Sequence, residues 1–365
     1  MRLRAAAVVA LAVPLLLLAG CGNDAASSGT TSATGSDAAV SSDASGTDAS
    51  GTDASGTDAS SSEAPTPGPE VPAASSVAAP VDKAELPTVS GKFGEKPTVT
   101  FPKTQAPNTL QRQVLIEGSG AEVQKSDWLI AHYSGQIWDG KVFDNSYDRK
   151  QPTGFQIGVG GVVSGWDVGL VGMKTGSRVL LSLPPADGYQ SAGNPQAGIK
   201  GTDTIVFVID IVKVIPPTQG GQTDVPTEKL PATVPTVTGD LGKQPTVKVG
   251  ASAKEPTKNQ VLTISKGTGP KVADNDKLLV QYEAVTWDNQ PGGSTWKVDE
   301  AAQAQGQQAG LQQVPVQEGS PFAQLKGITE GSRVLLLIPA TAADATQGTQ
   351  AQPAIAVVID VVAIS

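Results

Sequence analysis

The residues with chemical potential in this 365-residue chain are mainly aromatic, and they are unevenly distributed. Aromatic side chains form only 4% of the sequence, and eleven of the fifteen fall between Phe93 and Phe207. A single histidine and a single cysteine exclude a His/Cys zinc site and leave no well-supported Cys–His pair. His132 lies in an expected strand beside Tyr133, so we expect it to be a hydrogen-bonded structural residue. These counts favour chemistry based on aromatic rings, and no metal or cofactor is expected.

The elements that position these side chains occur twice along the chain. Pro87-Thr88-Val89-Ser90-Gly91 matches Pro235-Thr236-Val237-Thr238-Gly239, and the run 176–181 recurs at 331–336. Two copies of domain size indicate a duplication rather than a solenoid. We therefore predict a first repeat at 82–216 and a second repeat at 234–365, joined by a linker at 217–233 whose Pro- and Gly-rich start is typical of a connection.

Within the first repeat the pattern is mostly that of β-strands. The run Trp128–Trp138 is rich in β-branched and aromatic residues and ends at Asp139-Gly140, a strong hairpin signal. Apolar runs at Val179–Leu183 and Thr204–Val214 have strand length. One helix is expected, with Ser164 as its N-cap and Met173 near its end. The predicted fold class is α+β, with a mostly antiparallel sheet packed on the helix.

A series of motifs follows in a specific order through the first repeat. It reads His132-Tyr133, Gly140-Lys141-Val142-Phe143-Asp144, Phe155, Val162-Val163-Ser164-Gly165-Trp166, Gly176-Ser177-Arg178, Tyr189 and Phe207. Over about Asn108 to Ile215 this series resembles the FKBP family of peptidyl-prolyl isomerases. The resemblance implies two tandem FKBP-like domains, each an antiparallel sheet wrapped around a short α-helix with an apolar pocket between them.

The resemblance also assigns roles to individual residues of the pocket. Trp166 would form its floor, and Asp144 and Tyr189 would face the substrate, with Arg149 near Asp144. The implied walls are Tyr133, Phe143, Phe155, Val162, Val163, Ile199 and Phe207.

The chain departs from the family pattern in the segment beside the pocket. Asp187 and Gln190 stand where an aromatic residue and a glycine are usual, and Asn194 stands where histidine is frequent. These departures concern substrate preference and rate more than the activity itself.

The chemistry implied by the resemblance suits these residue types. Rotation about an X–Pro bond crosses a barrier of about 18–20 kcal/mol that arises from amide resonance. An apolar aromatic pocket can hold the prolyl ring and remove water from its carbonyl, which disfavours the planar amide relative to the twisted state. No nucleophile is needed for this reaction.

The second repeat keeps the strand framework but not the pocket residues. Pro321 or Phe322 stands at the position of Trp166, and Val357 stands at that of Phe207. Allowing for a longer loop, Trp296-Lys297 aligns with Phe143-Asp144. We therefore expect the second repeat to be catalytically silent, with a role in binding, spacing or dimerisation.

The first twenty residues are expected to be a lipoprotein signal peptide. Arg2 and Arg4 precede an uncharged apolar run at Ala5–Ala19, which has the length of a secretory h-region. The run ends at Leu18-Ala19-Gly20-Cys21, which resembles the lipobox of bacterial lipoproteins. That resemblance implies lipidation of Cys21 and anchoring at the extracytoplasmic face of the cell membrane; an ordinary secretory signal is the alternative.

Residues 21–81 are expected to be a disordered tether. They repeat Asp-Ala-Ser-Gly-Thr, turn Pro-rich, and hold eight acidic and no basic side chains. The net charge of −9 therefore belongs largely to the tether, and the acidic balance argues against a nucleic-acid partner.

The function that these observations favour is acceleration of X–Pro rotation in secreted or cell-wall proteins. The expected partners are proline-containing segments, macrolide immunosuppressants by resemblance, and the membrane through Cys21. The alternative is a non-catalytic, membrane-tethered binding or chaperone protein.

Overall fold

The computed structural model describes residues 76–297, 309–343 and 350–365, which belong to one compact unit. The expected signal peptide, Cys21 and nearly all of the expected tether lie outside the described residues. Among the residues that are described, no helix is long and apolar enough to cross a membrane.

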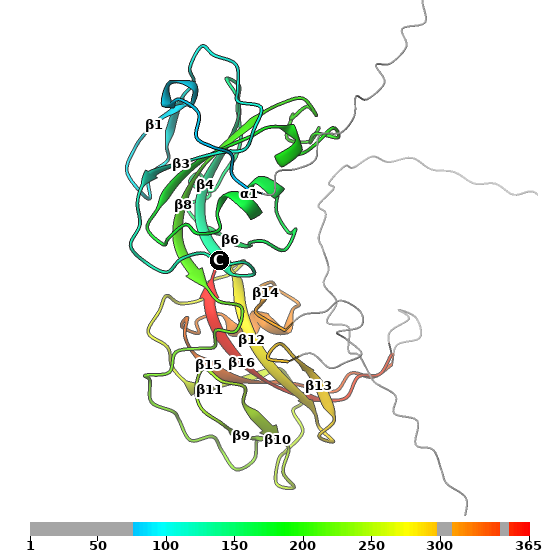
Figure 1. Ribbon diagram of the computed structural model, residues 1–365. Helices are drawn as coiled ribbons and strands as arrows, with labels where there is room; N and C mark the ends of the chain where they lie inside the picture. Colours follow the sequence, from blue (N-terminus) through cyan, green and yellow to red (C-terminus); the bar gives the residue numbers. More distant parts are fainter. Residues whose placement is uncertain (1–75, 298–308, 344–349) are drawn as a thin grey trace, which may run out of the picture. The chain divides into compact units, whose positions relative to one another are not determined.

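The first repeat is built on a six-stranded antiparallel sheet (Figure 1). The strand order is β3-β7-β8-β4-β5, and β6 also pairs with β4. The strands are β3 (Gln111–Ile116), β4 (Trp128–Ile137), β5 (Val142–Asn145), β6 (Thr153–Gln156), β7 (Arg178–Leu183) and β8 (Ile205–Ile215). Three of these strands were predicted from the sequence, and their ends agree to within one residue.

The turn between β4 and β5 forms where the sequence predicted it. Asp139 adopts a left-handed φ of 49°, and the amide of Gly140 donates to the carbonyl of Ile137 over 2.9 Å. Asp tolerates this conformation better than most residues because its short polar side chain can bond locally. The turn brings β5, with Phe143 and Asp144, back alongside β4.

Helix α1 (Ser164–Gly169) lies against the sheet and is shorter than predicted (Figure 1). Ser164 is its first helical residue, and Val163 occupies the N-cap position without a side-chain cap, so the predicted Ser164 cap is wrong. The helix ends early because Gly172 takes a φ of 83°, outside the helical region. Arg112 Nη1 donates to the carbonyls of Gly169 and Val171, which satisfies the helix end.

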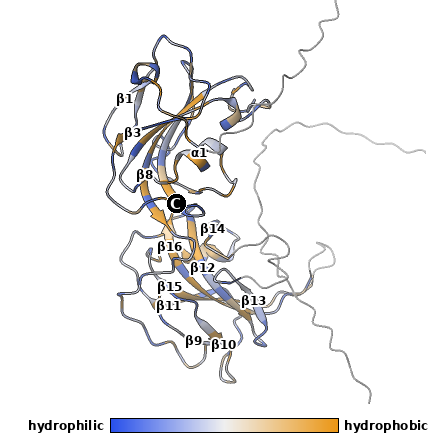
Figure 2. Ribbon diagram, in the orientation of Figure 1, coloured by the Kyte–Doolittle hydropathy of each residue, from blue (hydrophilic) through white to orange (hydrophobic). Residues whose placement is uncertain are grey.

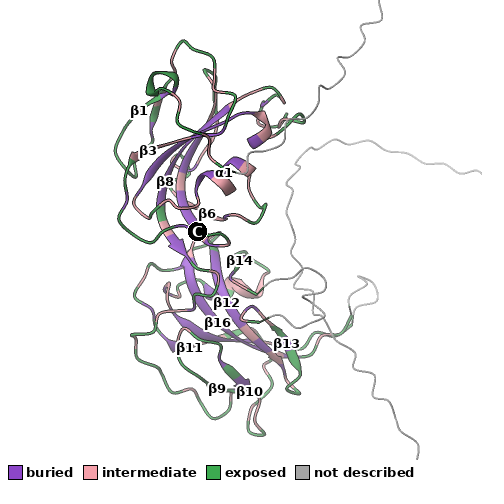
Figure 3. Cartoon of the chain, in the orientation of Figure 1, coloured by how far each residue is buried: buried purple, intermediate pink, exposed green. Residues whose placement is uncertain are grey.

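The second repeat forms an equivalent sheet with the order β11-β15-β16-β12-β13, and β14 pairs with β12. Its strands are β11 (Gln260–Ser265), β12 (Lys277–Thr286), β13 (Pro291–Ser294), β14 (Gln312–Pro315), β15 (Arg333–Ile338) and β16 (Ile355–Ile364). Hydrophobic residues run along β8, β12 and β16 (Figure 2), and these strands are largely buried (Figure 3).

The predicted α-helix of the second repeat is instead a 3₁₀-helix, η3 (Pro321–Leu325). The segment is short because Gly327 takes a φ of 83° two residues after it. Within it the amide of Lys326 donates to Ala323, three residues back, which is the 3₁₀ pattern.

A short hairpin precedes each sheet and is tied to it by a buried ion pair. The hairpins are β1 (Thr88–Ser90) with β2 (Thr98–Thr100), and β9 (Thr236–Thr238) with β10 (Thr246–Lys248). In the first repeat Arg178 binds Asp210 over 2.6 Å and also donates to the carbonyls of Gly91 and Glu95. Arg333 and Asp360 form the same arrangement in the second repeat. Short 3₁₀ turns, η1 (Lys83–Glu85) and η2 (Pro185–Asp187), complete the first repeat.

Candidate functional site

Three aromatic side chains of the first repeat meet around the indole ring of Trp166, and a fourth packs on one of them. The centroid of the indole ring lies 4.9 Å from that of Phe155, 5.1 Å from Phe207 and 5.7 Å from Tyr133, all nearly edge to face. Phe143 packs on Phe207 at 5.6 Å and 89°. Edge-to-face pairs of this kind are favourable beyond the area they bury, so the rings form a fixed apolar surface.

The strands explain why these rings converge. Tyr133 on β4 pairs with Ile209 on β8, and Gly135 pairs with Phe207, so alternate β4 positions face the same side as the rings. A Cβ atom at Gly135 would lie 2.6 Å from both Phe143 Cζ and Phe207 Cε1. Glycine is therefore required here for the two rings to approach the strand.

Beside the rings lies a polar network of Tyr133, Asp144 and Arg149. The hydroxyl of Tyr133 donates to Asp144, and Arg149 donates to Asp144 over 2.6 Å and to the tyrosine oxygen over 2.7 Å. The guanidinium carbon also lies 5.6 Å from the Tyr133 ring centroid. Burial and the neighbouring Asp144 raise the pKa of Tyr133 to about 12, so its phenol stays protonated. Burial alone would lower the pKa of Arg149, but its bonds to Asp144 and Tyr133 outweigh this effect and raise it.

The segment between β6 and α1 is held by one carboxylate of the helix. Asp167 accepts from the amides of Gly158 and Gly160 over 2.6 and 2.8 Å. These bonds fix the loop that leads into Val162 and Val163, which form one wall of the site. The helix thus supplies both Trp166 and the anchor of the adjacent wall.

The opposite side is formed by the flap, residues 184–203. It contributes Tyr189, Asn194, Gln196 and Ala197 to the site. Gln190, next to Tyr189, adopts a left-handed φ of 54° at the position where the family usually has glycine. Asp187, the other departure at this turn, is buried.

These elements enclose a cavity of about 450 Å³, within the range of small-ligand sites. Its lining residues are Tyr133, Phe143, Asp144, Phe155, Val162, Val163, Trp166, Tyr189, Asn194, Gln196, Ala197 and Phe207. The indole Nε1 of Trp166 is buried and has no hydrogen-bond partner among the described residues. Buried donors without a partner are rare in native structures, and a catalytic role is one of the explanations for them.

Two of the residues that the resemblance implied for the pocket, Arg149 and Ile199, do not line the cavity. Arg149 is hydrogen-bonded to Tyr133 and Asp144, which do line the cavity, and its own side chain is 48% exposed. Ile199 is only 3% exposed and belongs to the core cluster. It is turned inward because Asn194 and Ile199 bond to each other as an isolated bridge that closes the flap. Gln196 and Ala197, inside that bridge, line the cavity instead, and no sequence pattern marked them.

His132 has the structural role predicted for it. Its Nδ1 lies 3.0 Å from Ser146 Oγ, and its ring stacks on Tyr147 at 5.0 Å. Burial lowers the pKa of His132 against a smaller opposing effect of Asp210. Among the described residues no group of His, Cys, Asp and Glu side chains is arranged to hold a metal ion.

The second repeat lacks this arrangement, and strand register corrects one predicted equivalence. Gly135 pairs with Asp144 in the first repeat, as Ala284 pairs with Gly293 in the second. Asp144 therefore corresponds to Gly293, and Phe143 to Gly292, whereas Trp296-Lys297 lies further along the chain. Thr295 Oγ1 accepts from the Tyr282 amide just as Ser146 Oγ accepts from that of Tyr133, which fixes the alignment.

Comparison with known proteins finds a family match within the first repeat. Residues 120–212 match the family of FKBP-type peptidyl-prolyl cis-trans isomerases. An FK506-binding protein of Streptomyces anulatus is 39% identical over 121 residues, which are 33% of this chain and 98% of the relative. The isomerase FkpA of Escherichia coli K12 is 39% identical over 104 residues, which are 28% of this chain and 37% of the relative. The crystal structure of E. coli FkpA aligns with a TM-score of 0.28 at 39% identity, covering 30% of this chain and 49% of that one.

The family match and the sequence identities to these relatives define the class of this protein. The chain belongs to the FKBP-type peptidyl-prolyl cis-trans isomerase family. The matched segment lies within the first repeat, and it is an isomerase domain of this family.

Proposed function

We propose that the first repeat isomerises X–Pro bonds in extracytoplasmic proteins by holding the prolyl ring against Trp166. The observation that carries the proposal is the convergence of Tyr133, Phe155 and Phe207 on that indole ring within one cavity. Such a surface accepts the apolar pyrrolidine ring and excludes water from the neighbouring carbonyl. Loss of water disfavours the charge-separated planar amide, which lowers the barrier to rotation.

The polar groups of the site are assigned positioning roles in this mechanism. Tyr189 donates a hydrogen bond to a carbonyl of the substrate. Asp144, held by Arg149 and Tyr133, faces the carbonyl that turns out of the amide plane. No covalent intermediate is required, because the reaction breaks and forms no bond in the substrate.

The proposal is tested by isomerisation of a proline-containing peptide with the full chain and with Trp166→Leu, Asp144→Val and Tyr189→Phe variants. We expect kcat/KM to fall by about tenfold or more in Trp166→Leu, which corresponds to about 1.4 kcal/mol of transition-state stabilisation. Circular dichroism of each variant controls for folding. Activity that is insensitive to all three changes would contradict the proposal and favour a non-catalytic binding protein.

We also propose that the second repeat does not catalyse this reaction. Gly292 and Gly293 supply neither the ring of Phe143 nor the carboxylate of Asp144. Val314 pairs with Leu278 as Phe155 pairs with Leu129, so a second wall of the pocket is also aliphatic. Isomerase activity of a first-repeat Trp166→Leu variant equal to that of the wild type would contradict this proposal.

The proposed location is the extracytoplasmic face of the cell membrane, through a lipid on Cys21. Its support is the sequence that ends in Leu18-Ala19-Gly20-Cys21. Fractionation should recover the wild-type protein with membranes and a Cys21→Ala variant in the soluble fraction. Equal membrane association of both would contradict lipid anchoring.

Macrolide binding is proposed from the relatives, one of which is named an FK506-binding protein. The cavity offers the apolar floor and few polar groups that such ligands require. FK506 should inhibit peptide isomerisation by the wild type. Uninhibited turnover at saturating FK506 would contradict this part of the proposal.

A further inference from the structure

The strand that carries Tyr133 also contacts the second repeat. Leu129, Ala131 and Tyr133 of β4 lie in the core cluster that supports the cavity. Trp128, which precedes Leu129, and Ile130, which follows it, belong to a different cluster on the opposite face of the strand. The members of this inter-repeat cluster are Ile130, Ile215, Leu279, Leu311, Val362 and Ala363, with Trp128 packed against them.

Strand β6, which carries Phe155 of the cavity wall, has the same two-sided arrangement. Its neighbour Gly154 lies so close to the last residue of the chain that an added Cβ would be 2.8 Å from Ser365 Cβ. Ser365 is itself fixed, because its amide donates to the carbonyl of Lys277 over 2.8 Å and its Oγ accepts from Gln313 over 2.9 Å. The wall strand therefore packs on an ordered part of the second repeat.

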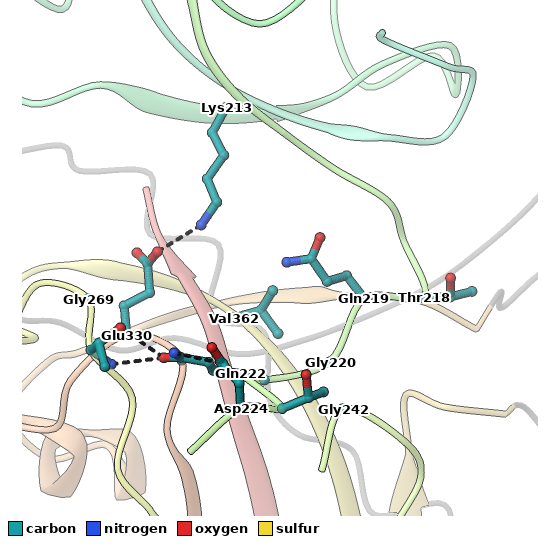
Figure 4. A pocket seen from close by; sticks show the side chains of 14 residues that line it. Lys213, Thr218, Gln219, Gly220, Gln222, Asp224, Gly242, Gly269, Glu330 and Val362 are labelled. Atoms are coloured by element: carbon teal, nitrogen blue, oxygen red, sulfur yellow. Dashed lines mark hydrogen bonds and ion pairs between the residues drawn. The ribbon is translucent and has the colours of Figure 1, made fainter. Parts of the chain in front are cut away.

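Two polar links join the same parts of the two repeats. Gln151, in the loop between β5 and β6, donates to Asp276 over 3.3 Å. Lys213 on β8 pairs with Ile130 in the sheet, and its ammonium lies 2.7 Å from Glu330 (Figure 4). Glu330 also accepts from the amide of Ile364 through its other oxygen. Lys213 and Glu330 line a polar cavity of about 540 Å³ beside the linker residues Thr218 to Asp224.

We propose that the second repeat is a positioning element for the isomerase site of the first. Successive side chains of a strand point to opposite faces of the sheet. Contacts of the second repeat with one face of β4 and β6 therefore also fix the positions of Tyr133 and Phe155, which lie on the opposite face, in the cavity. Close-packed interiors transmit strain, so loosening the contact on the outer face should displace the rings on the inner face. The second repeat thus acts on the reaction without a pocket of its own. This inference rests on the proposed assignment of catalysis to the cavity of the first repeat.

The test uses the full chain with Leu311→Asp, which places a carboxylate in the inter-repeat cluster where Leu311 is 5% exposed. A buried unpaired charge is strongly unfavourable, so the contact should open. Leu262→Asp is the matched control, because Leu262 packs on a separate apolar cluster of the same repeat. We measure peptide isomerisation and amide hydrogen exchange of the segment 153–157.

Leu311→Asp is expected to lower kcat/KM by about fivefold or more, mainly through a higher KM, and to speed exchange in β6. Exchange in β15 and β16 reports whether the second repeat remains folded. Leu262→Asp should change neither activity nor β6 exchange. Unchanged β6 exchange or unchanged kcat/KM in Leu311→Asp, or an equal loss in Leu262→Asp, would overturn the inference.

A second variant keeps the test valid if Leu311→Asp does not fold. Gln151→Ala combined with Lys213→Ala removes both polar links without altering either core. We expect faster β6 exchange and a smaller loss of activity in the same direction. Lys326→Ala is its control, since Lys326 pairs with Asp274 at an exposed site within the second repeat; equal behaviour of the two variants would overturn the inference.

The two proposals fail in different ways. If catalysis does not use the first cavity, Trp166→Leu remains active. If only the positioning role is wrong, Trp166→Leu still loses about tenfold or more in kcat/KM, while Leu311→Asp keeps wild-type turnover and β6 exchange.

Discussion

At the scale of single residues, the site depends on groups that hold one another in place. Asp144 contacts both Tyr133 and Arg149, and the same tyrosine ring packs edge to face on Trp166. The polar network and the aromatic surface therefore share one side chain. A change that moves Tyr133 should disturb both the apolar floor and the carboxylate.

Gly135 offers a direct test of this close packing. Gly135→Ala would place a methyl group 2.6 Å from the rings of Phe143 and Phe207, so both rings must move. We expect the free energy of unfolding to fall by about 1–3 kcal/mol and isomerase activity to fall with it. Chemical denaturation and the peptide assay measure the two effects.

Gly161→Ala is the control for that variant. An added Cβ there has no neighbour closer than 3.9 Å, so stability and activity should stay near wild type. Equal stability of Gly135→Ala and Gly161→Ala would show that the rings of Phe143 and Phe207 do not require a residue without a side chain at position 135.

His132 predicts the pH dependence of stability. Burial lowers its pKa below the ordinary value of 6.5, so near that pH the unfolded state binds more protons than the folded state. The stability that His132 contributes is fully present above about pH 6.5, near its pKa in the unfolded chain. It is lost as the pH falls below that value and through the lower pKa of His132 in the folded state. Unfolding free energies of the wild type should therefore decline between pH 7 and pH 5.

A His132→Gln variant separates this contribution from the rest. Histidine occurs only once in the chain, so the decline over this interval should be smaller in the variant. Denaturant unfolding at several pH values provides the comparison. Identical slopes in the two proteins would contradict the pKa argument.

At the scale of elements, the helix and its preceding loop position one wall of the cavity. Asp167 accepts two hydrogen bonds from the amides of Gly158 and Gly160, and the loop leads directly into Val162 and Val163. Asp167→Ala should lower the stability by about 1.5–3 kcal/mol, the range for hydrogen bonds to a charged group, and raise KM. Thermal unfolding and steady-state kinetics test this, and an unchanged KM would show that the wall forms without the anchor.

The sequence predicted these elements well where patterns are local. The Asp139-Gly140 turn and the β-branched runs of β4, β7 and β8 are short-range signals, and the ordered series of aromatic motifs located the cavity. The helix ends were less predictable, because Gly172 and Gly327 end their helices through positive φ angles that Gly permits but does not require.

Other features depend on long-range geometry that a single sequence does not encode locally. The sequence comparison aligned Trp296 with Phe143 because both are aromatic. The structural counterpart of Phe143 is Gly292, which has no side chain by which the sequence could identify it. Ile199 is buried and Gln196 faces the cavity only because Asn194 and Ile199 bridge the flap. Contacts such as that of Gly154 with Ser365 join residues more than two hundred positions apart.

At the scale of the whole molecule, the two repeats keep the same framework and differ in chemistry. Arg178 with Asp210 and Arg333 with Asp360 tie each hairpin to its sheet, so this feature belongs to the fold. Where the described residues of the two repeats can be aligned, only the first repeat has the aromatic cavity and the carboxylate of Asp144. The second repeat keeps the strand framework and lacks the pocket. This combination agrees with the proposed role of the second repeat in positioning the cavity of the first.

The most direct measurement of the central claim compares turnover of a proline peptide by two full-length variants, Trp166→Leu and Phe322→Leu. Both change an aromatic residue of the helical segment packed on a sheet, one in each repeat. Catalysis in the first cavity predicts a loss of about tenfold or more for Trp166→Leu and near wild-type kcat/KM for Phe322→Leu. Wild-type turnover by Trp166→Leu, or an equal loss in Phe322→Leu, would contradict it.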